Sequence, residues 1–162
     1  MPLPPDALSR LLTLRWAALV AWVGHQYPWS EDVVQQAFIK LSTIDPVPAN
    51  PSAWLFTTSR RLALNQIRSD QRRLTREAEY NQFPPYRSCR EFDAERAELM
   101  TALQNLPDIS RQIVVARIWG ELSFDAIAES LEISKSTVWR TYEQSLEQLR
   151  QFYESSAVEA NQ

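Results

Sequence analysis

Glycine is nearly absent from this chain, with two in 162 residues. Tight hairpin turns rely on residues that adopt positive φ, and glycine does so at the lowest steric cost. The hydrophobic fraction is 44%, and strong helix formers fill most of the remainder. The composition therefore predicts an all-α fold and argues against an all-β or glycine-turn-rich α/β fold. The length allows one domain of ordinary size or two small ones.

The sequence lacks a segment long enough to cross a membrane, and it has few of the residues that bind metals or act as catalytic nucleophiles and bases. The apolar run Trp16–Gly24 is much shorter than the roughly 20 residues that span a bilayer, and it lacks a signal-peptide pattern. We therefore expect a cytoplasmic protein without a membrane partner. Cys89 and His25 are the only residues of their types, so one chain offers no disulfide, no Cys/His metal site and no evident nucleophile or base. We expect neither an enzyme nor a bound metal or cofactor.

The charge is divided unevenly along the chain. Residues 1–76 hold 9 Lys/Arg and 5 Asp/Glu, a net charge of +4, whereas residues 77–162 hold 8 and 15, a net charge of −7. Such asymmetry indicates two units with different electrostatic tasks, of which the first is a candidate for binding a polyanion. Charge alone leaves open the alternative that both surfaces are merely solvated.

The first unit is expected to contain three helices. Asp6 is the expected N-cap of the first, which ends near Gly24, and Ser30 is the expected N-cap of the second. Prolines make residues 42–53 a stiff loop, and the third helix is expected at about residues 52–76. The predicted buried stripe of the second helix is Val33, Val34, Ala37, Phe38 and Leu41.

The third expected helix has one apolar face and one basic face when its residues are placed at steps of about 100°. Asp70 is the only acid among the six arginines between Arg60 and Arg76, whereas a solvated face usually mixes both signs of charge. This pattern favours a nucleic-acid-binding face over a plain solvent face. The apolar face holds Leu55, Phe56, Ser59, Leu62, Ala63, Ile67 and Leu74. The basic face holds Arg60, Arg61, Asn65, Arg68, Gln71 and Arg72.

A linker is predicted at residues 77–93, where helical periodicity fails and two prolines follow one another. It separates two small helical domains, residues 1–76 and 94–162. The second domain is expected to begin with helices at about residues 93–104 and 107–119, with Pro107 in the first turn of the latter.

The end of the second domain has the pattern of a helix-turn-helix. Ser123 and Ser134 are expected to cap two successive helices. Ala128, Ile133 and Val138 supply a small residue at the crossing, an apolar plug in the turn and an apolar anchor in the second helix. An αα-hairpin packed for stability alone is the alternative.

The second of these helices presents the residues that could contact DNA. Glu132 occupies the turn position that a glycine would ease. Near the start of the helix, exposed side chains could reach phosphates and base edges in a major groove. These candidates are Lys135, Ser136, Thr137, Trp139 and Arg140.

Three segments resemble signatures of one family. The strings EDVVQQAFIKL, AWLFTTSRRLALNQIRSDQRR and LPDISRQIVVARIWGELSFDAIAESLEISKSTVWRTYEQSLEQLR are similar to regions two and four of extracytoplasmic-function sigma factors. They occur in the family's order, with a linker between them, and cover most of residues 8–150. The resemblance implies a non-enzymatic subunit that directs core RNA polymerase to promoters.

The resemblance also implies roles for residues of the first domain. The second helix would dock on the clamp helices of the polymerase β′ subunit through Asp32, Gln35, Gln36 and Phe38, although core is the favoured place for the Phe38 ring. The loop at 42–53 would capture a flipped base of the minus-10 element. Trp54 is either a stacking platform or an anchor of the helix start. The phosphate and base contacts of the minus-10 element would be Arg60, Arg61, Asn65, Arg68 and Arg72.

For the second domain, the resemblance implies contact with the polymerase β flap and recognition of the minus-35 element through residues 135–140. The linker would thread toward the polymerase active-site and RNA-exit path. An anti-sigma factor is left open as a further partner. Trp139 stands where the family usually has Lys, Arg61 replaces a common Asn and Asn65 a common Asp, so the promoter sequence cannot be transferred from the family.

Two other functions compete with this interpretation. A dedicated helix-turn-helix regulator with a protein-binding N-terminal half would not predict the all-basic face between Arg60 and Arg72. A helical adaptor that binds only proteins would predict no nucleic-acid affinity in either half. We therefore predict a sigma factor.

Overall fold

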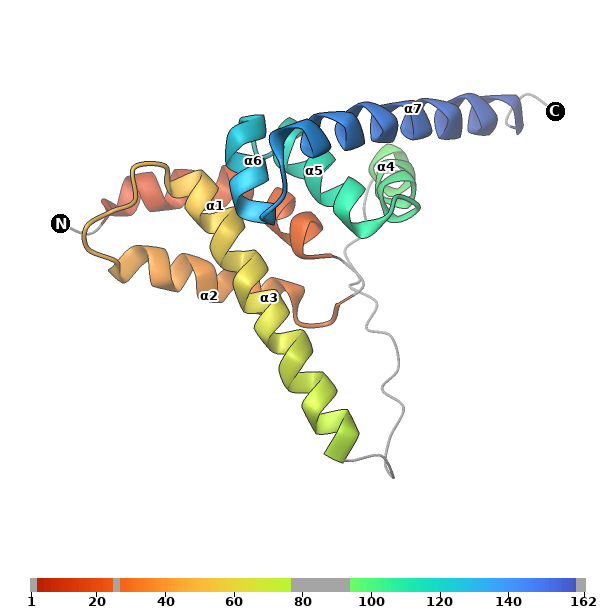
Figure 1. The fold of residues 1–162 in the computed structure, drawn as a ribbon. Helices are drawn as coiled ribbons and strands as arrows, with labels where there is room; N and C mark the ends of the chain where they lie inside the picture. The colour runs from red at the N-terminus through yellow and green to blue at the C-terminus, as the bar shows by residue number, and fades with distance from the viewer. Residues whose placement is uncertain (1–2, 25–26, 77–93, 160–162) are drawn as a thin grey trace. The chain divides into compact units, whose positions relative to one another are not determined.

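The computed structural model describes residues 3–24, 27–76 and 94–159 and is all-helical across these ranges, with seven α-helices and no strand (Figure 1). The chain divides into two compact units, Met1–Ser88 and Cys89–Gln162. The predicted all-α fold with two helical domains is confirmed. The predicted linker at 77–93, with Cys89, lies outside the described residues.

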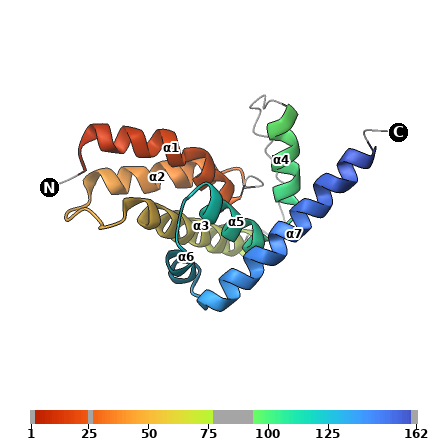
Figure 2. The ribbon, with the colours of Figure 1, turned by 90° about the horizontal axis from the view of Figure 1, so that it is seen from above.

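The first unit contains helices α1 (Pro5–Val23), α2 (Ser30–Thr43) and α3 (Pro51–Arg76), and each packs against the other two. Figure 2 shows α1 and α2 side by side. Trp22 lies at the centre with no exposed surface. Its Nε1 donates a hydrogen bond to the Phe56 carbonyl oxygen at 3.0 Å, and the two rings meet edge to face at 5.3 Å. This aromatic pair joins α1 to α3 in the core.

Two predicted helix starts are wrong, by two residues in α1 and by one residue in α2, and one predicted end is confirmed. Helix α1 begins at Pro5 with Pro4 as N-cap, because proline's fixed φ suits a first turn and its missing N–H needs no partner; Asp6 lies within that turn. Helix α2 begins at Ser30 itself, which is buried, with Trp29 as N-cap. Gly24 ends α1 at φ 114°, a backbone conformation that favours glycine.

The predicted buried face of α2 is confirmed, and so is that of α3 up to Ile67; the burial of Leu74 is not described. All five stripe residues of α2 are buried, and so are Leu55, Phe56, Ser59 and Ala63 of α3. Leu62 and Ile67 are half-buried. The start of α3 is held by Asn50, whose Oδ1 accepts from the Ala53 N–H at 3.0 Å. The basic side of α3 is therefore turned away from the core by the helical period itself.

The second unit contains α4 (Ala94–Gln104), α5 (Asp108–Ile118), α6 (Phe124–Leu131) and α7 (Lys135–Glu159). Helices α5, α6 and α7 pack on one another, and α4 packs on α7. Pro107 is the N-cap of α5 and lies just before the first turn in which it was expected. The core of this unit is aliphatic and includes Ile113, Val114, Val115, Ile127 and Val138, each with no exposed surface.

The turn between α6 and α7 has the predicted helix-turn-helix form. The Ser123 and Ser134 hydroxyls accept hydrogen bonds from the Ala126 and Thr137 N–H groups at 3.1 and 3.2 Å, which confirms both caps. Glu132 adopts the left-handed conformation, with φ 58° and ψ 39°. The Ile133 N–H then bonds to the Ala128 carbonyl at 3.1 Å. Glu132 thus makes the turn that glycine would ease.

Candidate nucleic-acid and polymerase interfaces

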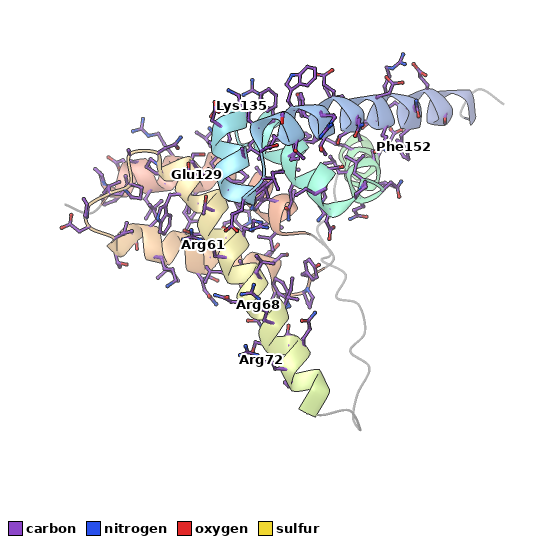
Figure 3. All side chains as sticks on the ribbon, viewed as in Figure 1. Arg61, Arg68, Arg72, Glu129, Lys135 and Phe152 are labelled. Carbon is purple, nitrogen blue, oxygen red and sulfur yellow. The ribbon has the colours of Figure 1, made fainter. Side chains whose placement is uncertain are left out.

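Four of the predicted minus-10 residues form one stripe along α3. Arg61, Asn65, Arg68 and Arg72 are all exposed. At about 100° per residue they fall within roughly 60° of one another on the helix surface. Arg61, Arg68 and Arg72 follow one another down α3 in Figure 3. We call these four residues the basic stripe.

Arg60 does not belong to the basic stripe. It is half-buried, and by its position in the helix it lies roughly 100° from the middle of the stripe. The predicted basic face is broad enough to include both residues, but Arg60 lies at its edge, about 100° around the helix from Arg61. Of the two, Arg61 has the placement that suits a DNA strand running along the stripe.

The single acid of this region, Asp70, is directed away from the basic stripe. Its Oδ2 accepts a hydrogen bond from Trp29 Nε1 at 3.1 Å, and its Oδ1 accepts one from Gln66 Nε2 at 3.1 Å. Arg73 lies 4.0 Å from Oδ1. The Trp29 ring is stacked on Tyr27 at a centroid distance of 4.8 Å. These contacts hold the carboxylate on the core side of α3, so the stripe keeps an undivided positive potential.

Trp54 and the loop before α3 lie at the N-terminal end of the helix that carries the stripe. The loop spans residues 44–50, which is shorter than the predicted 42–53, because α2 continues to Thr43 and α3 begins at Pro51. Trp54 follows in the first turn of α3, half-buried, with its N–H bonded to the Asn50 carbonyl at 3.0 Å. Arg15 Nε donates to Ser52 Oγ at 3.2 Å and ties this helix start to α1. A half-buried Trp54 has part of its ring surface available for stacking.

The outer face of α2 carries three of the four predicted polymerase contacts. Asp32, Gln35 and Gln36 are exposed. Phe38 is only 4% exposed and stacks on Trp16 at 6.2 Å, so its ring belongs to the core and cannot serve as a direct contact. Ile39 is 57% exposed and, by the helical period, lies between Asp32 and Gln35 on the same face. Ile39 is not among the polymerase contacts predicted from the sequence. Its angular position on the helix, between Asp32 and Gln35, is the signal that identifies it.

In α7, four of the five predicted minus-35 residues are exposed: Lys135, Ser136, Trp139 and Arg140. Thr137 is half-buried, and its Oγ1 lies 2.7 Å from Ser134 Oγ, so it helps to order the helix start. Lys135 Nζ lies 2.8 Å from Asp125 Oδ2. Trp139 is 54% exposed, an unusual exposure for so large an apolar ring.

A second set of contacts fixes α6 against α7. Phe124 meets the Tyr142 ring edge to face at 5.4 Å. The Arg117 guanidinium lies over the Phe124 ring at 4.6 Å and donates from Nη1 to the Leu122 carbonyl at 2.8 Å. Arg117 therefore stabilises the start of α6 through the Phe124 ring and the Leu122 carbonyl.

Across the part of the chain that the structure describes, no three His, Cys, Asp or Glu side chains are grouped so that they could hold a metal ion. None of the helices there combines the length and the apolar character that crossing a membrane requires.

Comparison with known proteins places both units in one family. The family model of sigma-70 region 2 matches residues 8–73, and that of sigma-70 region 4 matches residues 96–149. The ECF RNA polymerase sigma factor SigK of Mycolicibacterium vanbaalenii is 26% identical over 121 residues, which cover 71% of this chain and 62% of SigK. The chain thus spans less than two thirds of that relative's length. The ECF RNA polymerase sigma factor RpoE of Cereibacter sphaeroides is 23% identical over 124 residues, 75% of this chain and 68% of RpoE.

Two solved structures share the fold. The sigma factor RpoE of Bartonella quintana, solved in complex with the anti-sigma factor NepR, superposes with a TM-score of 0.67 at 17% identity, over 93% of this chain and 98% of that one. CnrH, solved with the cytosolic domain of CnrY, gives a TM-score of 0.55 at 24% identity, over 98% and 92%. Both family matches, in this order along an all-helical two-unit chain, show that the protein belongs to the sigma-70 family, as a sigma factor of the extracytoplasmic-function type with a region 2 and a region 4 domain.

Proposed function

We propose that this protein directs core RNA polymerase to promoters, with residues 1–76 engaging the minus-10 element and residues 94–162 the minus-35 element. The basic stripe is the observation that carries this proposal. Three exposed arginines and an asparagine lie along one side of α3, and the neighbouring carboxylate of Asp70 is held away from them. A DNA backbone carries a regular row of negative charges, which such a uniform row of positive side chains neutralises.

The loop at 44–50 and Trp54 extend the proposed minus-10 site beyond the N-terminal end of α3. Because the loop leads directly into the helix that carries the stripe, a strand lying along the arginines can deliver an unstacked base to the loop. Trp54 offers that strand a partly exposed aromatic surface. Arg60 is placed at the edge of this site and makes at most a flanking contact.

The proposed polymerase contact is the outer face of α2, which we define as Asp32, Gln35, Gln36 and Ile39. An exposed isoleucine among polar residues is typical of the centre of a protein interface with a polar rim. The proposed partner is the pair of clamp helices of the β′ subunit, and the region 4 domain is proposed to rest on the β flap. These partners place the protein in the cytoplasm.

The region 4 domain is proposed to bind duplex DNA through the start of α7. Lys135, Ser136, Trp139 and Arg140 are exposed there on a helix that Ser134 caps and Phe124 supports. An anti-sigma factor is a further proposed partner, since the Bartonella quintana RpoE was solved bound to one. Sigma-70 family membership agrees with the expectation that the chain is not an enzyme.

Run-off transcription tests the proposal. Purified protein is added to bacterial core polymerase with a fragmented genomic template, and transcript ends are mapped. Specific new start sites that share two upstream elements are expected, and core polymerase alone is the control. A variant with Arg61, Arg68 and Arg72 changed to Gln should bind core polymerase and yield no specific transcripts. Specific initiation by that variant would contradict the assigned role of the stripe.

A further inference from the structure

Glu143 lies on the side of α7 that the proposed function turns toward DNA. At about 100° per residue, Ser136, Arg140 and Glu143 fall within roughly 60° of one another and opposite the buried Val138. All three are exposed, whereas Val138 has no exposed surface. Glu143 therefore shares its face of the recognition helix with Arg140, one helical turn further on.

The Glu143 carboxylate makes no hydrogen bond or ion pair to any residue that the structure describes. The next acid on this face, Glu147, differs: Arg150 Nη2 lies 2.8 Å from its Oε1 and Gln151 Nε2 lies 3.0 Å away. The hydrogen bond from Arg150, followed by that from Gln151, lowers the pKa of Glu147. The Glu147 carboxylate is thus bound by side chains of its own helix, whereas the Glu143 carboxylate can accept a hydrogen bond from a ligand.

A free carboxylate on this face restricts what it can meet in a major groove. Phosphate oxygens repel it, so it adds nothing to backbone affinity. Among base edges it needs a donor, and only the N4 amino group of cytosine and the N6 amino group of adenine donate there. In adenine the N7 acceptor lies beside that donor, and it would repel the second oxygen of the Glu143 carboxylate. Cytosine is the base that fits.

The spacing to Arg140 agrees with adjacent base pairs. Three residues of α-helix rise about 4.5 Å, and one DNA base step rises about 3.4 Å. We propose that Glu143 is a specificity-determining residue that accepts a hydrogen bond from the N4 amino group of a cytosine in the minus-35 element, next to the base contacted by Arg140. This inference rests on the proposed function and adds the base class that α7 selects.

The experiment selects promoters from a library with a randomised upstream element, using holoenzyme assembled from the full chain. Wild type should select cytosine at one position of that element. In Glu143→Ala the preference for cytosine should fall about fivefold, the lower end of the effect of losing one base contact. In Glu143→Gln the preference should shift toward adenine, because a glutamine amide can hydrogen-bond to both N6 and N7 of adenine. Glu147→Gln is the matched control, because it removes the same charge from the same face, and it should keep the wild-type preference.

A chemical probe checks the atom involved. A promoter in which the selected cytosine is replaced by an analogue without the N4 amino group should bind wild-type holoenzyme about fivefold more weakly and the Glu143→Ala holoenzyme equally well. Specific initiation with the same base preferences in wild type and both Glu143 variants would overturn this inference alone. Failure of wild type to initiate at any specific site would overturn the proposed function as well.

Discussion

The Nζ atom of Lys135, at the first residue of α7, lies 2.8 Å from the Oδ2 atom of Asp125 in the first turn of α6. Both side chains are largely exposed, at 61% and 71%, so water and salt weaken their mutual attraction. The pair nevertheless places a carboxylate beside a cation that is proposed to meet a phosphate. Asp125 of α6 thereby reduces the positive potential that Lys135 of α7 presents to DNA.

Removing that carboxylate should strengthen DNA binding. Asp125→Asn keeps the side-chain shape and frees Lys135, so holoenzyme affinity for promoter DNA should rise a few-fold at low salt, with a salt slope steeper by up to about one unit. Glu129→Gln is the control, because it removes an exposed charge from the same helix without breaking this pair; Figure 3 labels both Glu129 and Lys135. Equal effects of the two variants would show that only net charge matters.

Neutralising the basic stripe should weaken promoter binding in a salt-dependent way. With Arg68→Gln and Arg72→Gln together, the slope of log affinity against log salt should fall by roughly one unit for each lost phosphate contact. Arg73→Gln is the matched control, since Arg73 lies on the other side of α3 next to Asp70. Titrations of labelled promoter at several salt concentrations measure the slope. A slope unchanged from wild type would show that the basic stripe does not contact DNA phosphates and is only exposed to solvent.

The outer face of α2 should hold core polymerase. Asp32→Ala with Gln36→Ala should reduce co-purification with core enzyme, and Ile39→Ala alone should reduce it further than either single polar change, because an apolar centre contributes more than a polar rim. Asp6→Ala is the control, as an exposed first-turn acid of a different helix, α1. Circular dichroism verifies that each variant is folded. Wild-type binding by the Ile39 variant would remove that residue from the interface.

Glu132→Gly should stabilise the region 4 domain. A left-handed φ of 58° costs a residue with a Cβ atom about 1 kcal/mol, and glycine avoids this cost while losing some chain entropy. The free energy of unfolding should therefore increase by a few tenths to about 1 kcal/mol in denaturant titrations. Glu129→Gly, within α6, should instead lower it by about 1 kcal/mol. Destabilisation by both changes would mean that the Glu132 side chain itself contributes to the turn.

Several features of the fold and of the site could be predicted from the sequence. The helix order, the buried faces of α2 and α3 and the helix-turn-helix follow from residue periods of 3.6 and from local capping, which involve neighbours along the chain. Exposure of Asp32, Arg68 and Arg140 follows from the same periodicity. The caps Ser123 and Ser134 follow from the same local preferences. Asp6 and Ser30 do not serve as N-caps, because α1 and α2 begin after Pro4 and Trp29 without any side-chain cap hydrogen bond, so local capping preference does not fix these two starts.

Other features were decided only by the tertiary structure. Phe38 is a core residue because Trp16, on another helix, covers its ring. Asp70 leaves the basic stripe undisturbed because Trp29, 41 residues earlier, donates a hydrogen bond to it. Lys135 is paired because the turn brings Asp125 to it across ten residues. The amino-acid sequence by itself determines which face of each helix is apolar, since that depends on spacing along one helix; which polar groups meet depends on contacts between helices, and these exist only once the chain has packed.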